Sequence, residues 1–197
     1  QTLERIIRFN KCLFIHMNLY ELILKTFGWK VEVSTPDFKK SIICVAPHTS
    51  NWDFILGELA IRSVKRKSGF LMKEAWFAFP LGYIFRALGG IPVPKKKGSD
   101  LTNEIIKRFN ESESMTIAIT PEGTRKKVSK WRTGFLYIAN GANVPVQLAS
   151  IDYSKKEIKL NDVFQPTGNI EADIASIKEF YKGFSGKRPE KFSVEPQ

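Results

Sequence analysis

One of the chain's two histidines, His48, lies five residues before Asp53 in the stretch CVAPHTSNWDF, residues 44–54. A neutral imidazole removes a proton near pH 7 when a carboxylate on Nδ1 fixes its tautomer and stabilises the imidazolium that forms. A turn from a strand into a helix would bring Asp53, near the start of the helix, back to His48. Taken alone, this spacing also fits a structural hydrogen bond. The pair is therefore interpreted either as a general base with its orienting carboxylate or as a structural hydrogen bond.

No nucleophile of the protein's own accompanies His48. The sequence has no GxSxG elbow and no cysteine in a cationic setting, so the base has to activate a bound group, and a substrate hydroxyl is the natural candidate. Cys12 and Cys44 lack the CxxC spacing, and two histidines do not make a zinc site. We therefore expect buried, reduced thiols of a cytosolic protein, no metal and no cofactor.

The stretch PEGTRKK, residues 121–127, follows a predicted buried strand and has the residue types of an anion site. Gly123 lets a ligand approach the backbone, Thr124 offers a hydroxyl and a helix cap, and Arg125 offers a planar fork suited to phosphate. An ordinary turn with a solvated basic flank is the alternative. Its position directly after a buried strand favours the binding site.

Apolar segments with the periods of strands and helices alternate along the chain. Strands are predicted at residues 30–33, 41–46, 89–94, 115–120, 143–150 and 156–160, and helices at residues 52–64, 99–109, 135–140 and 171–181. This order predicts a single α/β domain over residues 1–197, with a mainly parallel sheet flanked by helices. In such sheets ligands bind beyond the carboxyl ends of the strands, where both HTSNWD and PEGTR fall.

Charge and surface patterns indicate an anionic partner. Lys and Arg number 31 against 20 Asp and Glu, which gives a net charge of +11 and leaves nucleic acid, anionic lipid, phosphorylated cofactors and acidic carrier proteins open. Residues 3–27 have the spacing of an amphipathic helix or helix pair, which either packs on the core or lies in a lipid interface. The aromatic run at 75–85 is broken by Pro80 and Gly82, and no run is long enough to span a bilayer.

Four ordered blocks of the sequence resemble the glycerolipid acyltransferase family, typified by bacterial 1-acylglycerol-3-phosphate acyltransferases. They are HTSNWD, GGIPVPKK, PEGTR and the VPV at 144–146, and the resemblance covers roughly residues 40–150. It implies transfer of a fatty acyl group from acyl-CoA or acyl carrier protein to a hydroxyl of a lysophospholipid-type acceptor, in phospholipid biosynthesis. It also implies that His48 is the base and Asp53 orients it, while Glu122, Gly123, Thr124 and Arg125 bind the acceptor's phosphate end.

The second block departs from the family pattern. Lys95 and Lys96 occupy the region where the family often has an Asp-Arg pair, so a point charge replaces a bidentate clamp on the phosphate. An acceptor other than lysophosphatidate, such as an acylated amino acid, therefore stays open.

A non-catalytic lipid-binding or nucleic-acid-binding module also stays open. Dispersed cations and the lack of RRM or KH signatures argue against nucleic acid. We expect peripheral attachment to an anionic membrane from its cytoplasmic side. The run at 75–85 would then be a wall for the acyl chain or a lipid-facing surface, with plain core packing as its alternative.

Overall fold

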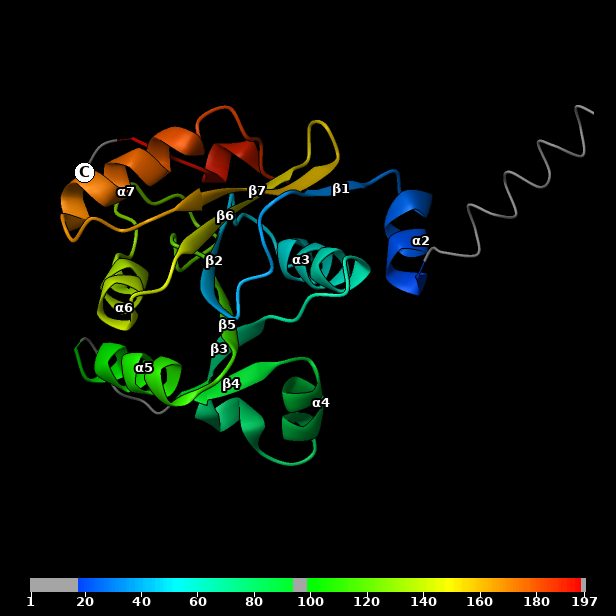
Figure 1. The fold of residues 1–197 in the computed structure, drawn as a ribbon. Helices are drawn as coiled ribbons and strands as arrows, with labels where there is room; N and C mark the ends of the chain where they lie inside the picture. The colour runs from blue at the N-terminus through cyan, green and yellow to red at the C-terminus, as the bar shows by residue number, and fades with distance from the viewer. Residues whose placement is uncertain (1–17, 94–98, 196–197) are drawn as a thin grey trace, which may run out of the picture.

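The computed structural model describes residues 18–93 and 99–195 and shows a twisted sheet between two layers of helices (Figure 1). The strand order is β1-β7-β6-β2-β5-β3-β4, and every neighbouring pair is parallel except β6 with β7. The strands are β1 (Lys30–Val33), β2 (Lys40–Ala46), β3 (Gly69–Lys73), β4 (Gly90–Val93), β5 (Met115–Ile119), β6 (Val146–Asp152) and β7 (Glu157–Phe164). The predicted α/β class with a mainly parallel sheet is confirmed.

The helices divide between the two faces of the sheet (Figure 1). One face is covered by α5 (Ser99–Glu111), α6 (Gly134–Ala142) and α7 (Ile170–Phe180). On the other side lie α2 (Leu19–Thr26), α3 (Trp52–Ser63) and α4 (Leu81–Ala87), with α4 at the β4 edge. Two short 3-10 helices, Glu74–Phe77 and Pro189–Lys191, complete the elements. None of the helices in these described residues is long and apolar enough to cross a membrane.

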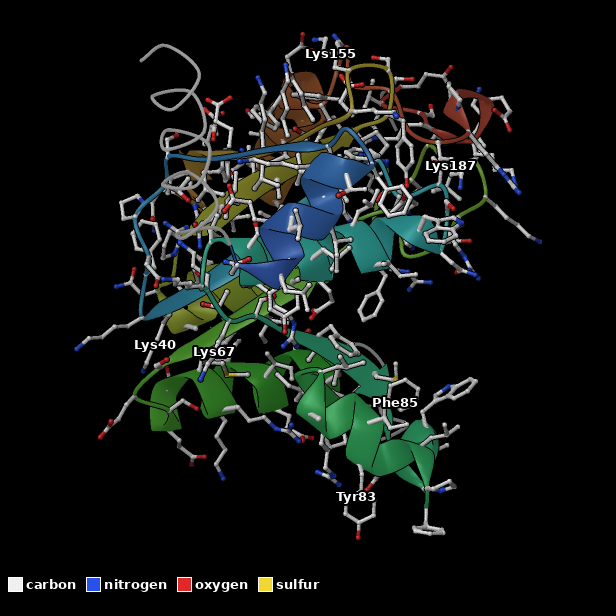
Figure 2. The ribbon with its side chains drawn as sticks, turned by 90° about the vertical axis from the view of Figure 1, so that its right-hand side faces the viewer. Lys40, Lys67, Tyr83, Phe85, Lys155 and Lys187 are labelled. Atoms are coloured by element: carbon white, nitrogen blue, oxygen red, sulfur yellow. The ribbon has the colours of Figure 1, made fainter. Side chains whose placement is uncertain are left out.

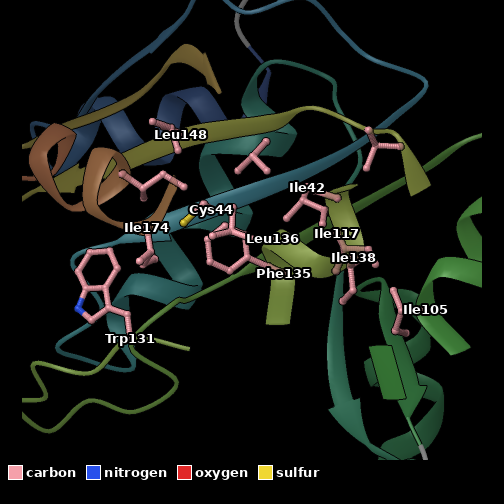
Figure 3. Packing of buried hydrophobic residues seen from close by; sticks show 14 of the residues in the cluster. Ile42, Cys44, Ile105, Ile117, Trp131, Phe135, Leu136, Ile138, Leu148 and Ile174 are labelled. Atoms are coloured by element: carbon pink, nitrogen blue, oxygen red, sulfur yellow. The ribbon is translucent and has the colours of Figure 1, made fainter. Parts of the chain in front are cut away.

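The central strand β2 is buried on both faces, as its uninterrupted apolar sequence predicts. Side chains of successive residues point to opposite faces of a strand. Ile42 and Cys44 therefore join the large cluster under α5, α6 and α7, which is shown in Figure 3, while Ile43 packs on the other face. Cys44 is a free and fully buried thiol, and the Tyr181 hydroxyl donates a hydrogen bond of 2.6 Å to its carbonyl oxygen.

Two segments differ from the sequence prediction. Strand β3 was not predicted, because GFLMK lacks both β-branched residues and a period of two. The run at 75–85 is not plain core: it lies within the first 3-10 helix and α4, and most of its large apolar side chains are exposed. Of the predicted amphipathic segment 3–27, the structure describes residues 18–27, which include α2, and Cys12 lies outside the described residues.

The topology creates a crevice at the carboxyl ends of β2 and β5. These strands are neighbours, but the chain leaves β2 through α3 on one face and leaves β5 through α6 on the other. Where connections diverge in this way, the loops at the strand ends separate and leave room for a ligand. His48 follows β2 and Glu122 follows β5, so both motifs meet at this point.

Candidate active site

His48 and Asp53 are in contact. Nδ1 of His48 lies 3.2 Å from Oδ2 of Asp53, and 18% of the His48 side chain is exposed against 2% for Asp53. The contact is within ion-pair distance but is not aligned as a hydrogen bond, which is common for catalytic pairs without a bound substrate. Asp53 lies in the first turn of α3, where a negative charge is favoured by the helix dipole. The imidazole is thus oriented by a buried carboxylate and is itself partly exposed.

Asp53 is held by donors on both of its oxygens. The backbone N–H groups of Thr49 and Ser50 each donate to Oδ2 at 2.8 Å, and the Tyr153 hydroxyl donates to Oδ1 at 2.7 Å. Burial opposes ionisation, but the contacts with His48, Tyr153, Ser50 and Thr49 outweigh it and lower the pKa of Asp53 below its ordinary value of 3.8. Asp53 is therefore ionised at neutral pH and can stabilise a protonated His48.

Glu122 also contacts His48, but through the backbone. The N–H of His48 donates to Oε1 of Glu122 at 2.7 Å, while Oε2 has no hydrogen-bond partner among the described residues. Glu122 is buried, and desolvation outweighs the hydrogen bond from His48, so its pKa is raised to about 7. Whereas the resemblance implied a contact with phosphate, this geometry suits a carboxylate that supports the loop carrying His48.

An apolar cavity of about 470 Å³ lies between α3 and the sheet, and His48 and Asp53 are part of its lining. Six strands and α3 contribute apolar side chains to it, among them Ile43, Val45, Phe54, Ile61, Ala149 and Leu160. No residue of the run at 75–85 lines this cavity. Its volume and apolar lining suit a hydrocarbon chain whose reactive end reaches His48.

A second cavity, also of about 470 Å³, shares the loop at residues 49–52 with the first site, and Asn51 lines both. This cavity is cationic, and Thr124 and Arg125 line it as the sequence prediction for a phosphate site requires. The remaining lining residues are Thr49, Ser50, Asn51, Trp52, Lys126, Lys187, Arg188 and Lys191. We refer to it as the cationic cavity.

The other predicted binding residues have different positions. Gly123 has a φ of +62°, and a Cβ there would lie 2.3 Å from Nε of Arg132, so the turn after Glu122 needs glycine. Lys95 and Lys96 lie outside the described residues.

Sequence reasoning missed Tyr153 and the three cations at 187–191, because each reaches the site only through tertiary packing.

Comparisons with known proteins agree with this architecture. The family model described as Acyltransferase matches residues 28–151, well over half of the chain, and the chain therefore belongs to this acyltransferase family. Among solved structures, the chain is similar to PlsC, the 1-acyl-sn-glycerophosphate (LPA) acyltransferase from Thermotoga maritima. The identity is 20% over 85% of this chain and 78% of that chain, with a TM-score of 0.52, which shows a shared fold. No curated protein sequence matches the chain.

Proposed function

We propose that the protein transfers a fatty acyl group from acyl-CoA or acyl carrier protein to the hydroxyl of a lysophospholipid, with 1-acylglycerol-3-phosphate as the first candidate acceptor. One observation carries this proposal: the His48–Asp53 pair lines the apolar cavity, and the residues between the two, 49–52, line the cationic cavity. A lysophospholipid has the same order of parts, with an acyl chain and a phosphate on either side of the reacting glycerol.

In the proposed mechanism His48 acts as general base. Its Nε2 takes the proton of the acceptor hydroxyl as the oxygen attacks the thioester carbonyl, while the ionised Asp53 holds Nδ1. The tetrahedral intermediate then collapses, the carbon–sulfur bond breaks, and the leaving thiolate takes the proton from His48. A positioned base of this kind contributes ~10²–10⁴ in rate.

The first test is acyl transfer itself. Purified protein is incubated with radiolabelled acyl-CoA or acyl carrier protein and a total polar lipid extract, and the labelled product is identified by chromatography and mass spectrometry. We expect an acylated phospholipid, and we expect His48→Ala to lower the rate by at least ~10² while the fold stays intact. Normal turnover by this variant would remove His48 from the chemistry. Binding of lipid without any turnover would favour a non-catalytic lipid carrier.

We further propose that the α3 side of the molecule rests on a membrane, from its cytoplasmic side. All but two of the exposed large hydrophobic side chains in the described residues lie at 19–27, 52–55 or 76–84, in or next to α2, α3 and α4. Figure 2 views this side, with Tyr83 and Phe85 of α4 labelled. The most exposed members are Phe79 at 86%, Tyr83 at 74%, Phe27 at 68% and Leu19 at 66%. Aromatic side chains of this kind insert at the headgroup level of a bilayer.

Vesicle sedimentation tests this surface. Phe79→Ser together with Tyr83→Ser should weaken binding to anionic vesicles severalfold, whereas Tyr137→Ser, on the opposite face of the sheet, should have no effect. Binding should also fall as salt rises, since each basic residue near an anionic surface contributes about 1 kcal/mol. Unchanged sedimentation of the double variant would remove this surface from the proposal.

A further inference from the structure

The outer wall of the cationic cavity comes from a part of the chain beyond the family match. Residues 187–191 follow α7 and lie outside residues 28–151, yet Lys187, Arg188 and Lys191 line this cavity together with Arg125 and Lys126. The lining contains no carboxylate. Within residues 18–93 and 99–195, none of these five cations forms an ion pair.

Specific contacts fix this segment against the loop that carries the His48–Asp53 pair. The backbone N–H of Arg188 donates to Oγ1 of Thr49 at 3.2 Å, and the Ser185 carbonyl accepts from the N–H of Tyr153 at 2.8 Å. Between them, Gly186 packs so closely that an added Cβ would lie 2.7 Å from Oγ1 of Thr49. The segment is therefore built into the site and does not simply lie near it.

The side chains of the segment are oriented as well. The Lys187 ammonium lies over the indole of Trp52, 5.0 Å from the ring centroid, in a cation–π contact that directs it toward the cavity. Arg188 adds a planar fork that can donate to two oxygens of one phosphate. Five like charges line one cavity, and Glu190 of the same segment is not part of that lining. The mutual repulsion of the five cations is relieved when a multiply charged anion binds.

We propose that residues 187–191 complete a phosphate-binding site shared with Arg125 and Lys126, which holds a phosphate group of a substrate during acyl transfer. The identity of the substrates rests on the proposed function. Two sources supply the same chemistry: the phosphate of the lysolipid acceptor and the phosphates of coenzyme A.

A binding experiment without turnover separates this proposal from the proposed function. The His48→Ala protein is titrated by calorimetry with coenzyme A, dephospho-coenzyme A and glycerol 3-phosphate. The comparison protein carries three further substitutions, Lys187→Gln, Arg188→Gln and Lys191→Gln. Its affinity for at least one of the three probes should be about ten- to a hundredfold lower, since hydrogen bonds to charged groups are strong. The matched control is Lys30→Gln, Lys39→Gln and Lys67→Gln, which removes three exposed charges outside the cavity lining. Figure 2 shows Lys67 at the opposite end of the molecule from Lys187.

The pattern of losses identifies the source of the phosphate. If the substitutions lower the affinity for coenzyme A more than the affinity for dephospho-coenzyme A, the site binds the 3′-phosphate of the donor. A loss for glycerol 3-phosphate assigns it to the acceptor. Equal weakening in the control, unchanged affinity of the triple variant for all three probes, or no binding of any probe would overturn the proposal.

Protection of the unmodified protein gives a second measurement that needs no variant. Coenzyme A or glycerol 3-phosphate at saturation should slow acetylation of Lys187 and Lys191 severalfold, read by mass spectrometry, and leave Lys67 unchanged. Equal acetylation of all three lysines with and without ligand would contradict the proposal.

Discussion

Two buried carboxylates lie beside His48, and their pKa values are shifted in opposite directions. Asp53 belongs to the first turn of α3, just after the loop that follows β2, and Glu122 belongs to the loop that follows β5. Asp53 contacts His48 and three hydrogen-bond donors, and its pKa is lowered. Glu122 receives one donor on Oε1 and none among the described residues on Oε2, and its pKa is raised to about 7. Burial alone raises the pKa of a carboxyl group, so the number of donors decides between the two outcomes. Asp53 therefore provides a permanent charge, and Glu122 provides a neutral or weakly charged support.

Asp53→Asn should have the largest effect, because it removes the permanent charge beside His48. Without that charge the imidazolium formed in the reaction loses its stabilisation, and we expect kcat to fall by ~10²–10⁴ with little change in the KM of the acceptor. The matched control is Asp162→Asn, at an exposed position on β7. A kcat within twofold of wild type would mean that the charge of Asp53 does not support the reaction.

Glu122→Gln tests the raised pKa of Glu122 through the pH dependence of stability. The pKa of Glu122 is about 7 in the folded protein against an ordinary value of 4.5, so the folded protein binds the proton more tightly than the unfolded chain. This stabilisation is full below pH 4.5 and is lost as pH rises through 7, and its size is on the order of 3 kcal/mol. Gln keeps an oxygen for His48 N–H but does not titrate.

Urea denaturation at pH 5 and pH 8 measures this difference. The free energy of unfolding of wild type should fall between these values by more than that of Glu122→Gln, with Glu111→Gln on α5 as a control for one exposed negative charge. Asp53 has the opposite sign, because its lowered pKa gives a stabilisation that is lost only as pH falls below 3.8. Parallel pH profiles of wild type and Glu122→Gln would contradict the proposed environment of Glu122.

Arg125→Lys tests whether the basic residues of the loop after β5 bind the phosphate of the acceptor. Lys keeps the charge but loses the planar fork, so the KM of a phosphate-bearing acceptor should rise roughly ten- to a hundredfold, while that of the donor stays constant. Arg86→Lys on the exposed side of α4 is the control. A change in the donor's KM alone would assign the loop to the donor's phosphates. The acceptor would then be a lipid without phosphate, such as an acylated amino acid.

The sequence predicted the parts of this comparison that depend on local patterns. The apolar runs of β2 and β5, the first turn of α3 with Asp53, and the position of His48 and Glu122 after their strands all follow from residue type and spacing. The environment of each carboxylate does not follow, because it depends on distant chain segments. Tyr153 is 100 residues from Asp53 in the sequence, and His48 is 74 residues from Glu122. No local pattern indicates which donors fold onto which oxygen.

Tyr153→Phe should have the smallest effect on kcat of these substitutions. It removes one donor from Asp53 and leaves the others, so kcat should fall about two- to tenfold with both KM values unchanged, as a hydrogen bond of 0.5–1.5 kcal/mol requires. If Tyr153 positions Asp53, the same substitution in the Asp53→Asn protein should cost almost nothing further. Tyr137→Phe, at an exposed hydroxyl on α6, controls for loss of a phenol. Equal losses in the presence and absence of the Asp53 carboxylate would mean that the Tyr153 hydroxyl acts independently of Asp53, because Phe keeps the ring and its edge contact with Trp29.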